Sequence, residues 1–194
     1  MKRTPRGFTL IELLVSVALF SVVMLISVGS LVAMAEAARK AESIKSVLNN
    51  LNFAFDSMSR TIRTGYLYHC TDGTGDTYSA MGAPASPQNC PTFGSSYLAL
   101  EGSRGNPGSA GDQIIYRLRN DRVEVSENSG TTFLPLTAPE VTVESLRFYV
   151  SGAASGDGKQ PYMVITLSGY IQVGEGNRTS IELQTALTQR LYDQ

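Results

Sequence analysis

The residues that could support nucleophilic catalysis are few in this sequence. The chain contains a single histidine, His69, which stands directly before Cys70. A Ser–His or Cys–His catalytic pair would need this imidazole as its general base. Because Cys70 is a candidate for a disulfide, the pattern favours a loop or surface histidine over a catalytic one. We therefore expect no enzyme activity.

Metal ligands are similarly sparse. Cys70 and Cys90 lack the spacing of a zinc finger, and His69 alone cannot complete a zinc site. Asp72 and Asp76 lie in a glycine-rich stretch and are weak calcium candidates. Calcium takes about six to eight oxygen ligands, more than this stretch fixes, so solvated turn aspartates are favoured. We expect no metal and no cofactor.

Three arginines, Arg117, Arg119 and Arg122, could form a basic patch that binds DNA. Glu124 and Glu127 follow them closely, and the net charge of the chain is −1, which gives no bulk attraction for nucleic acid. A salt-bridged strand surface is therefore the favoured interpretation. We expect no nucleic-acid partner.

The elements that must position these residues begin with an N-terminal segment in three parts. A short basic leader ends at Gly7, the sequence Phe8–Glu12 carries one acid at its end, and Leu13–Ala35 contains no charge. This uncharged run of about 23 residues would form a helix of about 34 Å, enough to cross a bilayer core of about 30 Å. Within it, Gly29 marks either a bend or a close helix contact. The charges of the leader are Lys2, Arg3 and Arg6.

Basic residues before an apolar run predict a cytoplasmic N-terminus, so the part of the chain after Ala35 is expected outside the cytoplasm. A secretory signal has a shorter apolar region, with a small-residue cleavage site after it. Here the one sharp cleavage-like junction, Gly7–Phe8, precedes the run. The apolar helix would therefore remain after processing.

The order of basic leader, Gly7, Phe8–Glu12 and long apolar helix resembles the signal of type IV prepilins and type II secretion pseudopilins, and the motif GFTLIELLV carries the resemblance. The resemblance implies cleavage after Gly7 by a prepilin peptidase and N-methylation of Phe8. It also implies other pilin or pseudopilin subunits, an inner-membrane assembly platform and membrane lipid as partners. The subunit would be stored in the bacterial inner membrane and then move into a pilus or pseudopilus.

Glu12 has two compatible interpretations. Thr9-Leu10-Ile11-Glu12 fits a capping box, in which the threonine and the acid satisfy the first backbone N–H groups of a helix. A carboxylate beside a long apolar run is also costly unless it is paired. In the family that the motif resembles, this acid pairs with the amine freed on a neighbouring subunit's first residue, here Phe8. That pairing would set the axial register during assembly.

Beyond Ala35 the sequence becomes polar, yet an apolar stripe continues at helical spacing. Gly65 is expected to end the helix after Thr64. A helix over Phe8–Thr64 would pack its second half on a sheet, which we favour over a coiled-coil seam because strand-like sequence follows. The stripe consists of Ile44, Leu48, Leu51, Phe55, Met58 and Ile62, widened by Val47 and Ala54.

Residues 66–112 form a long loop rich in glycine, serine, proline and asparagine, with one short strand at Tyr97–Leu100. Alternating sequence then predicts antiparallel strands, with Asn120-Asp121 as a hairpin turn. This order predicts an α+β fold, in which the long helix packs on an antiparallel β-sheet. The later strands are expected at Ile114–Arg119, Arg122–Ser126, Val141–Val150, Met163–Val173 and Thr179–Arg190.

The two cysteines, Cys70 and Cys90, lie in this long loop. An extracytoplasmic position would permit a disulfide between them. The bridge would close a loop of about 20 residues and stabilise the fold by about 3 kcal/mol. Two free thiols are the less favoured alternative.

The later part of the chain also resembles minor subunits, namely the J-type minor pseudopilin of type II secretion and PilW-like minor pilins, through Gln113–Arg119 and Glu140–Phe148. This resemblance implies a minor filament subunit that helps to initiate or cap assembly and so supports secretion or pilus function. The alternative is a pilus-tip or competence subunit whose 66–112 loop recognises DNA or a surface. The expected divisions are residues 1–7 (leader), 8–35 (transmembrane and filament-core helix), 36–64 (amphipathic helix) and 65–194 (extracytoplasmic β domain).

Overall fold

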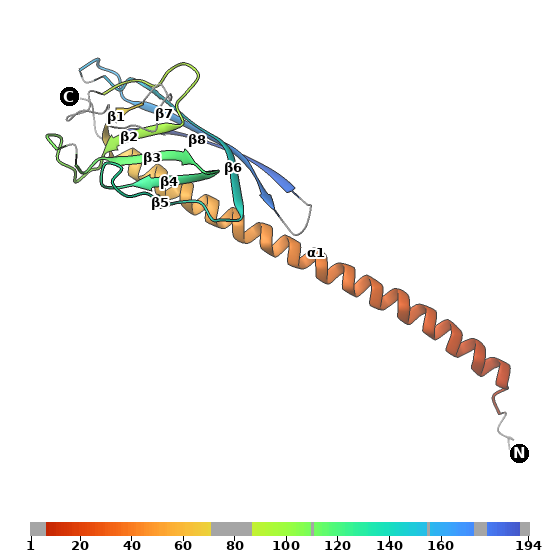
Figure 1. Ribbon diagram of the computed structural model, residues 1–194. Helices are drawn as coiled ribbons and strands as arrows, with labels where there is room; N and C mark the ends of the chain where they lie inside the picture. The colour runs from red at the N-terminus through yellow and green to blue at the C-terminus, as the bar shows by residue number, and fades with distance from the viewer. Residues whose placement is uncertain (1–6, 71–86, 110, 155, 173–177, 191–194) are drawn as a thin grey trace, which may run out of the picture. The chain divides into compact units, whose positions relative to one another are not determined.

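The computed structural model describes residues 7–70, 87–109, 111–154, 156–172 and 178–190. The chain divides into two compact units, Met1–Ser43 and Ile44–Gln194. Helix α1 (Leu10–Thr64) contributes to both units, and strands β1 to β8 lie in the second. One long N-terminal helix packed against antiparallel sheets confirms the predicted α+β fold (Figure 1).

The start of α1 is set by Thr9. The helix was expected from Phe8, whereas α1 begins at Leu10. The Thr9 side-chain oxygen accepts a hydrogen bond from the Glu12 backbone N–H (3.4 Å), and the Thr9 carbonyl accepts one from Leu13 (3.2 Å). A threonine that caps a helix in this way has non-helical backbone angles, so the helical residues begin after it.

Three serine hydroxyls in the first unit are satisfied by the helix itself. Each donates a hydrogen bond to the carbonyl oxygen four residues earlier, which removes the need for another polar partner. α1 also continues through Gly29 without a break. The three bonds join Ser16 to Glu12 (2.7 Å), Ser21 to Val17 (2.8 Å) and Ser27 to Val23 (2.7 Å).

In the second unit, the later turns of α1 bury the stripe that the sequence predicts. The buried side chains pack in one core cluster with residues of both sheets, among them Leu98, Phe148 and Ile165. Ile44 and Leu48, at the beginning of the stripe, are half-buried. The preference for packing on a sheet over a coiled-coil seam is therefore correct. The buried helix residues are Val47, Leu51, Ala54, Phe55, Met58 and Ile62.

Gly65 ends α1 for a different reason from the one expected. Its N–H donates a hydrogen bond to the Thr61 carbonyl (2.9 Å), but its φ is not positive, so it is not a left-handed cap. A Cβ at this position would overlap the Leu100 side chain and would lie 2.8 Å from the Glu101 carbonyl oxygen. The glycine is required because strand β2 passes directly against the end of the helix.

The strands form two antiparallel sheets rather than one. The first has the order β1-β2-β3-β4-β5, and the second has the order β6-β7-β8. A bridge between Ser95 and Phe148 connects the segment before β2 to β6, so the two sheets share one core (Figure 1). The strands are β1 (Tyr66–His69), β2 (Tyr97–Glu101), β3 (Ile114–Arg119), β4 (Arg122–Ser126), β5 (Leu134–Pro135), β6 (Val141–Ser151), β7 (Tyr162–Gln172) and β8 (Arg178–Thr188).

Strands β3 and β4 have the expected bounds, and β2, β6, β7 and β8 differ from the expected ranges by one or two residues at an end. Asn120 and Asp121 have φ values of 49° and 58°, as a tight hairpin turn requires. Strands β1 and β5 were not expected. β1 has only four residues, and Leu67 within it has a φ of 53°. β5 has only two residues, one of which is Pro135. Neither strand therefore shows an alternation of polar and apolar residues that could be recognised in the sequence.

The alternation of β6 changes phase along the strand, and a β-bulge explains the change. Val141 and Val143 are buried, and the next buried residue is Leu146, three positions on rather than two. The pairing of β6 with β7 shifts register between Val143 and Ser145. The extra residue of the bulge keeps all the apolar residues of β6 on the core face.

Candidate assembly surface and processing site

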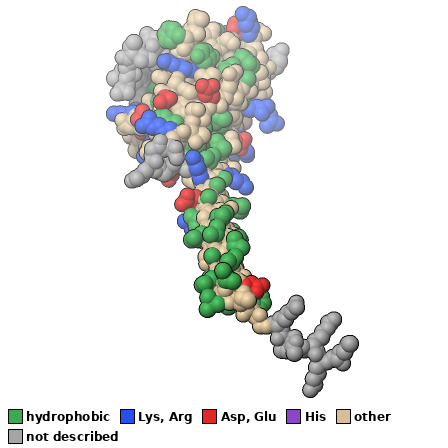
Figure 2. Space-filling view, turned by 90° about the vertical axis from the view of Figure 1, so that its right-hand side faces the viewer, with side chains coloured by type: hydrophobic (Ala, Val, Ile, Leu, Met, Phe, Trp, Pro, Cys, Tyr) green, Lys and Arg blue, Asp and Glu red, His purple; other side chains and the backbone are tan. Residues whose placement is uncertain are grey.

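The first unit consists largely of a helix whose apolar side chains are exposed. Phe8, Leu10 and Leu25 are 76%, 79% and 75% exposed, and large hydrophobic residues continue in this state to Met34. Figure 2 shows hydrophobic side chains along the visible face of this helix. Covering a single Leu, Ile or Val side chain contributes about 1.5–3 kcal/mol, so this surface requires an apolar environment.

α1 is the one helix among the described residues that is long and apolar enough to cross a membrane, by length and composition. Its most apolar 18-residue window has a mean hydropathy of 2.5, and none of that window is buried in the protein. A buried core helix would pass the same test of composition but would be covered by its own chain. The exposure therefore favours lipid or other helices as the natural cover.

The predicted processing residues lie just before this helix. Gly7 is exposed and has no atom within 4 Å of the position that a Cβ would occupy. Phe8 is exposed and lies outside α1, so the Gly7–Phe8 peptide bond is in exposed, non-helical chain. The basic residues Lys2, Arg3 and Arg6 lie outside the described residues.

Glu12 lies in the first turn of α1, where its negative charge suits the positive end of the helix dipole. The threonine half of the predicted capping box is present, since the Glu12 N–H donates to the Thr9 side chain. The Glu12 carboxylate itself has no hydrogen-bond or ion-pair partner within the described part of the chain. This acid is therefore available to a group from outside the chain.

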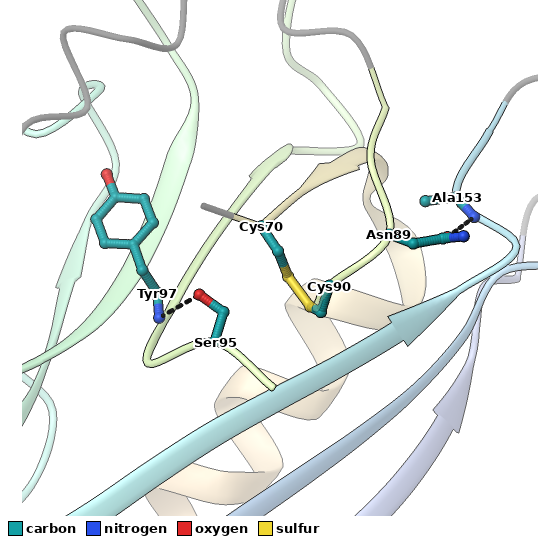
Figure 3. Close-up of a disulfide and its surroundings, with 6 residues drawn as sticks. All are labelled: Cys70, Asn89, Cys90, Ser95, Tyr97 and Ala153. Atoms are coloured by element: carbon teal, nitrogen blue, oxygen red, sulfur yellow. Dashed lines mark hydrogen bonds between the residues drawn. A yellow bond between two sulfur atoms is a disulfide. The ribbon is translucent and has the colours of Figure 1, made fainter. Parts of the chain in front are cut away.

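Cys70 and Cys90 form a disulfide, which fixes the two ends of the segment between them. The Cys90 N–H donates to the Val150 carbonyl (3.1 Å), which holds this end against β6. Next to it, the Asn89 side-chain oxygen accepts a hydrogen bond from the Ala153 N–H (2.9 Å), as Figure 3 shows. The disulfide thus joins the end of β1 to a segment that is already bonded to the second sheet.

Arg117 does not belong to an open basic patch. Its Nη2 lies 2.8 Å from Glu124 Oε2, and its guanidinium lies 3.4 Å from the centre of the Phe133 ring. The arginine is 9% exposed, so the cation is covered by a carboxylate and an aromatic ring. Arg119 and Arg122 pair across the hairpin at its outer end. The expected salt-bridged strand surface is present at Arg117.

The remaining candidates for chemistry do not form a site within the described residues. His69 is half-buried at the end of β1, next to a cysteine that is part of the disulfide. The calcium candidates Asp72 and Asp76 lie outside the described residues. In the described ranges, no group of three or more His, Cys, Asp and Glu could hold a metal ion. Asp157, in another glycine-rich loop, accepts a hydrogen bond from the Lys159 N–H (2.7 Å), as a turn aspartate does.

Comparison with known families adds one decisive observation. The family model of the prokaryotic N-terminal methylation motif matches residues 2–28. The chain therefore carries the prepilin-type N-terminal motif of type IV pilin-like proteins. No curated protein and no solved structure matches it. This motif is typical of a structural rather than an enzymatic class of protein, and it implies processing by a prepilin peptidase and assembly with other pilins.

The pilin-like chain contains one further feature that the sequence did not indicate. Glu101, at the end of β2, is 1% exposed, and the half-buried Asp112 lies at the end of the following loop. Glu101 is the last residue of a strand whose five residues are all buried. Both faces of this strand are buried because other parts of the chain cover them. The sequence of the strand does not indicate that cover, so the burial of Glu101 could not be predicted.

Proposed function

We propose that this pilin-like chain is a minor subunit of a type II secretion pseudopilus or a type IV pilus, which helps to initiate or cap filament assembly. The observation that supports the proposal best is the exposed apolar helix that begins two residues after an accessible Phe8. The acid in its first turn has no carboxylate partner among the described residues. Such a surface is stable in lipid and can exchange lipid contacts for contacts with neighbouring helices.

In this proposal each division of the chain has its own task. Residues 1–7 are a leader that a prepilin peptidase removes, and Phe8 is then N-methylated. Residues 8–35 anchor the chain in the inner membrane with a cytoplasmic N-terminus and later lie in the filament core. Residues 36–64 connect this part to the globular part and pack on its sheets, and residues 65–194 remain outside the cytoplasm.

The Glu12 carboxylate has a defined role in the proposal. Cleavage after Gly7 creates a new amine at Phe8, and an incoming subunit presents this amine to Glu12 of its neighbour. An amine and a carboxylate that pair in an apolar environment avoid the cost of two separately buried charges. The pair therefore favours one axial position of a subunit over positions shifted along the helix.

The experiment that tests the proposal isolates sheared filaments from cells that produce the full chain. We expect the filament fraction to contain this chain in a few copies relative to the major subunit, and mass spectrometry to show a methylated N-terminus at Phe8. A chain that remains entirely in the membrane while filaments form normally without it would contradict a role as a filament subunit. A chain as abundant as the major subunit would contradict the minor role.

The alternative of a tip subunit that recognises DNA or a surface receives no specific support from the described residues of the 66–112 loop. Arg117, from the basic patch considered for DNA binding, is paired with Glu124 and covered by Phe133. We therefore propose the assembly role alone.

A further inference from the structure

Two carboxylates lie at the loop that joins β2 to β3, of which the structure describes residues 102–109 and 111–113. Glu101 ends β2 and is 1% exposed. Asp112 lies at the far end of the loop and is half-buried. In each carboxylate one oxygen atom accepts a hydrogen bond from the protein, and the other oxygen atom is buried without one.

One oxygen of each carboxylate accepts a hydrogen bond, in one case from a backbone N–H group and in the other from a side-chain amide. Asp112 Oδ2 accepts a hydrogen bond from the Asn106 N–H (2.8 Å), and the Glu101 carboxylate accepts one from the Gln113 side chain. Glu101 Oε2 and Asp112 Oδ1 are buried and have no hydrogen-bond partner. Buried polar atoms are paired in nearly all proteins, so two such oxygens at one loop indicate a missing ligand.

The two carboxylates are also close enough to repel each other. Burial raises the pKa of Glu101, the nearby Asp112 raises it further, and the Gln113 hydrogen bond lowers it. Among the described residues, neither acid lies within ion-pair distance of a lysine or arginine. A buried carboxylate that lies close to a second acid is stabilised when a proton or a cation neutralises its charge.

The backbone of the loop passes close to the free oxygen of Glu101. A Cβ at Gly105 would lie 2.5 Å from Glu101 Oε2, so the backbone passes directly beside the free oxygen. The Tyr66 hydroxyl donates a hydrogen bond to the Gly105 carbonyl (3.1 Å), which holds the loop in this position. Carboxylate oxygen atoms are the donor type that hard cations prefer.

We propose that Glu101 and Asp112 bind a hard divalent cation, preferentially calcium, which fixes the 102–113 loop to the end of β2. The two free carboxylate oxygens would supply the charged ligands, and backbone carbonyl groups of the loop and water would complete the coordination. Calcium is preferred to magnesium because an irregular glycine-rich loop suits its variable coordination, whereas magnesium requires a nearly ideal octahedron. This site is separate from Asp72 and Asp76.

The test uses the full chain in detergent, first stripped with a chelator and then titrated with calcium. We expect one calcium ion per chain from this site and a rise in melting temperature of about 5 °C at a concentration about a hundredfold above Kd. Glu101→Gln and Asp112→Asn keep the side-chain shapes and should each abolish the rise. Asp157→Asn is the matched control, since it changes an exposed acid of another glycine-rich loop and should leave the rise intact.

A second measurement does not depend on how the acid variants fold. Terbium replaces calcium at oxygen sites and emits when a nearby tyrosine is excited, and Tyr66 is bonded to this loop. We expect tyrosine-sensitised terbium emission from the wild-type chain, displaced by calcium. Gly105→Ala, which keeps both acids but fills the space beside Glu101, should reduce that emission strongly.

Two results would overturn the proposal. The first is a stripped wild-type chain whose melting temperature and terbium emission do not respond to calcium at about millimolar concentration, but whose stability rises as the pH falls. Because the folded-state pKa of Glu101 is raised, that pattern would identify a proton as the neutralising group. The second is a calcium response that persists unchanged in both acid variants and in Gly105→Ala, which would place the ion elsewhere.

Discussion

Glu12 is the residue on which the proposed assembly mechanism depends most. Its N–H is bonded to Thr9, whereas its carboxylate has no partner among the described residues. In the proposed filament this acid would lose water and would require an amine as its partner. Glu12→Ala should therefore lower the amount of the chain in sheared filaments at least about tenfold, which corresponds to about 1.4 kcal/mol.

The control for this prediction is Glu36→Ala, which removes an exposed acid from the same helix. Its amount in filaments should equal that of the wild-type chain, as measured by quantitative immunoblotting of the filament and membrane fractions. Equal filament levels for Glu12→Ala and the wild type would exclude the proposed pairing with the Phe8 amine.

Gly65 shows how a single residue can determine how closely two elements approach. An added Cβ would meet the Leu100 side chain and the Glu101 carbonyl, and the backbone oxygen cannot move without moving β2. We expect Gly65→Ala to lower the free energy of unfolding by about 1–3 kcal/mol, as overpacking does. Thermal unfolding of the full chain in detergent measures the change. Gly108→Ala, whose nearest contact is 3.4 Å away, should leave the melting temperature within about 2 °C.

At the scale of elements, the β3–β4 hairpin is stabilised by one covered ion pair. Arg117 bonds to Glu124 across the two strands, and their side chains are only 10% and 18% exposed. Removing the arginine would leave the Glu124 carboxylate without a counter-ion in a partly dry position. Arg117→Ala should therefore cost about 3 kcal/mol of stability, measured by denaturant unfolding.

Arg119→Ala provides the comparison, because Arg119 is exposed at the end of the same strand. It should change stability by no more than about 0.5 kcal/mol. The double variant Arg117→Ala/Glu124→Ala should recover part of the loss, since no unpaired carboxylate remains. A double variant that is less stable by the sum of the two single changes would show that the two side chains do not interact.

The junction of α1 with the sheets contains two buried tyrosines. The Tyr68 hydroxyl donates to the carbonyls of Ile62 (2.6 Å) and Gly65 (2.9 Å), and burial raises its pKa. Burial raises the pKa of Tyr116 to about 12, against a smaller lowering effect of a hydrogen bond with Thr61. Both phenols therefore keep their protons in the folded state at a pH where the unfolded chain begins to lose them.

The sign of the resulting pH dependence follows from linkage. Because the folded-state pKa values are raised, the contribution of these tyrosines is complete below pH 10.0 and is lost as the pH rises from there to about 12. Denaturant unfolding on both sides of pH 10.0 should show this fall, and Tyr116→Phe should make it shallower. An alkaline fall of the same steepness in Tyr116→Phe would show that Tyr116 does not contribute to it.

The sequence predicted the elements whose pattern is periodic and local. The stripe from Ile44 to Ile62 and the hairpin around Asn120-Asp121 could be recognised because helical spacing and a tight turn leave a direct mark on residue order. The gap of three between Val143 and Leu146 was present in the sequence, but it became a bulge only when β7 was seen beside it.

Features that depend on distant contacts could not be predicted. β1 is short and irregular, and only its pairing with β2 makes it a strand. The role of Gly65 depends on Leu100, and the burial of Glu101 depends on a loop that returns over the end of β2. At the candidate assembly surface, Gly7, Phe8 and Glu12 were predicted from the motif, whereas the absence of a partner for Glu12 among the described residues required the structure.

At the scale of the whole molecule, the proposed assembly requires the chain to be stable in two apolar environments, first lipid and then a filament. The uncharged run from Leu13 to Ala35 permits this exchange because neither environment can solvate a charge. A lysine near the middle of the run should therefore impair both states. Val23→Lys places a cation on a residue that is 60% exposed, at a cost of about 2.5–3.5 kcal/mol in a membrane helix.

We expect Val23→Lys to lower both the fraction of the chain that resists alkaline extraction from membranes and the amount in sheared filaments. Asn50→Lys is the matched control, because it adds the same charge to an exposed position on the later part of α1 and should change neither quantity. If Val23→Lys lowered filament entry but not membrane retention, the helix would be packed more tightly in the filament than in lipid. If it lowered neither, the apolar run would not be the part of the chain that passes from lipid into the filament core.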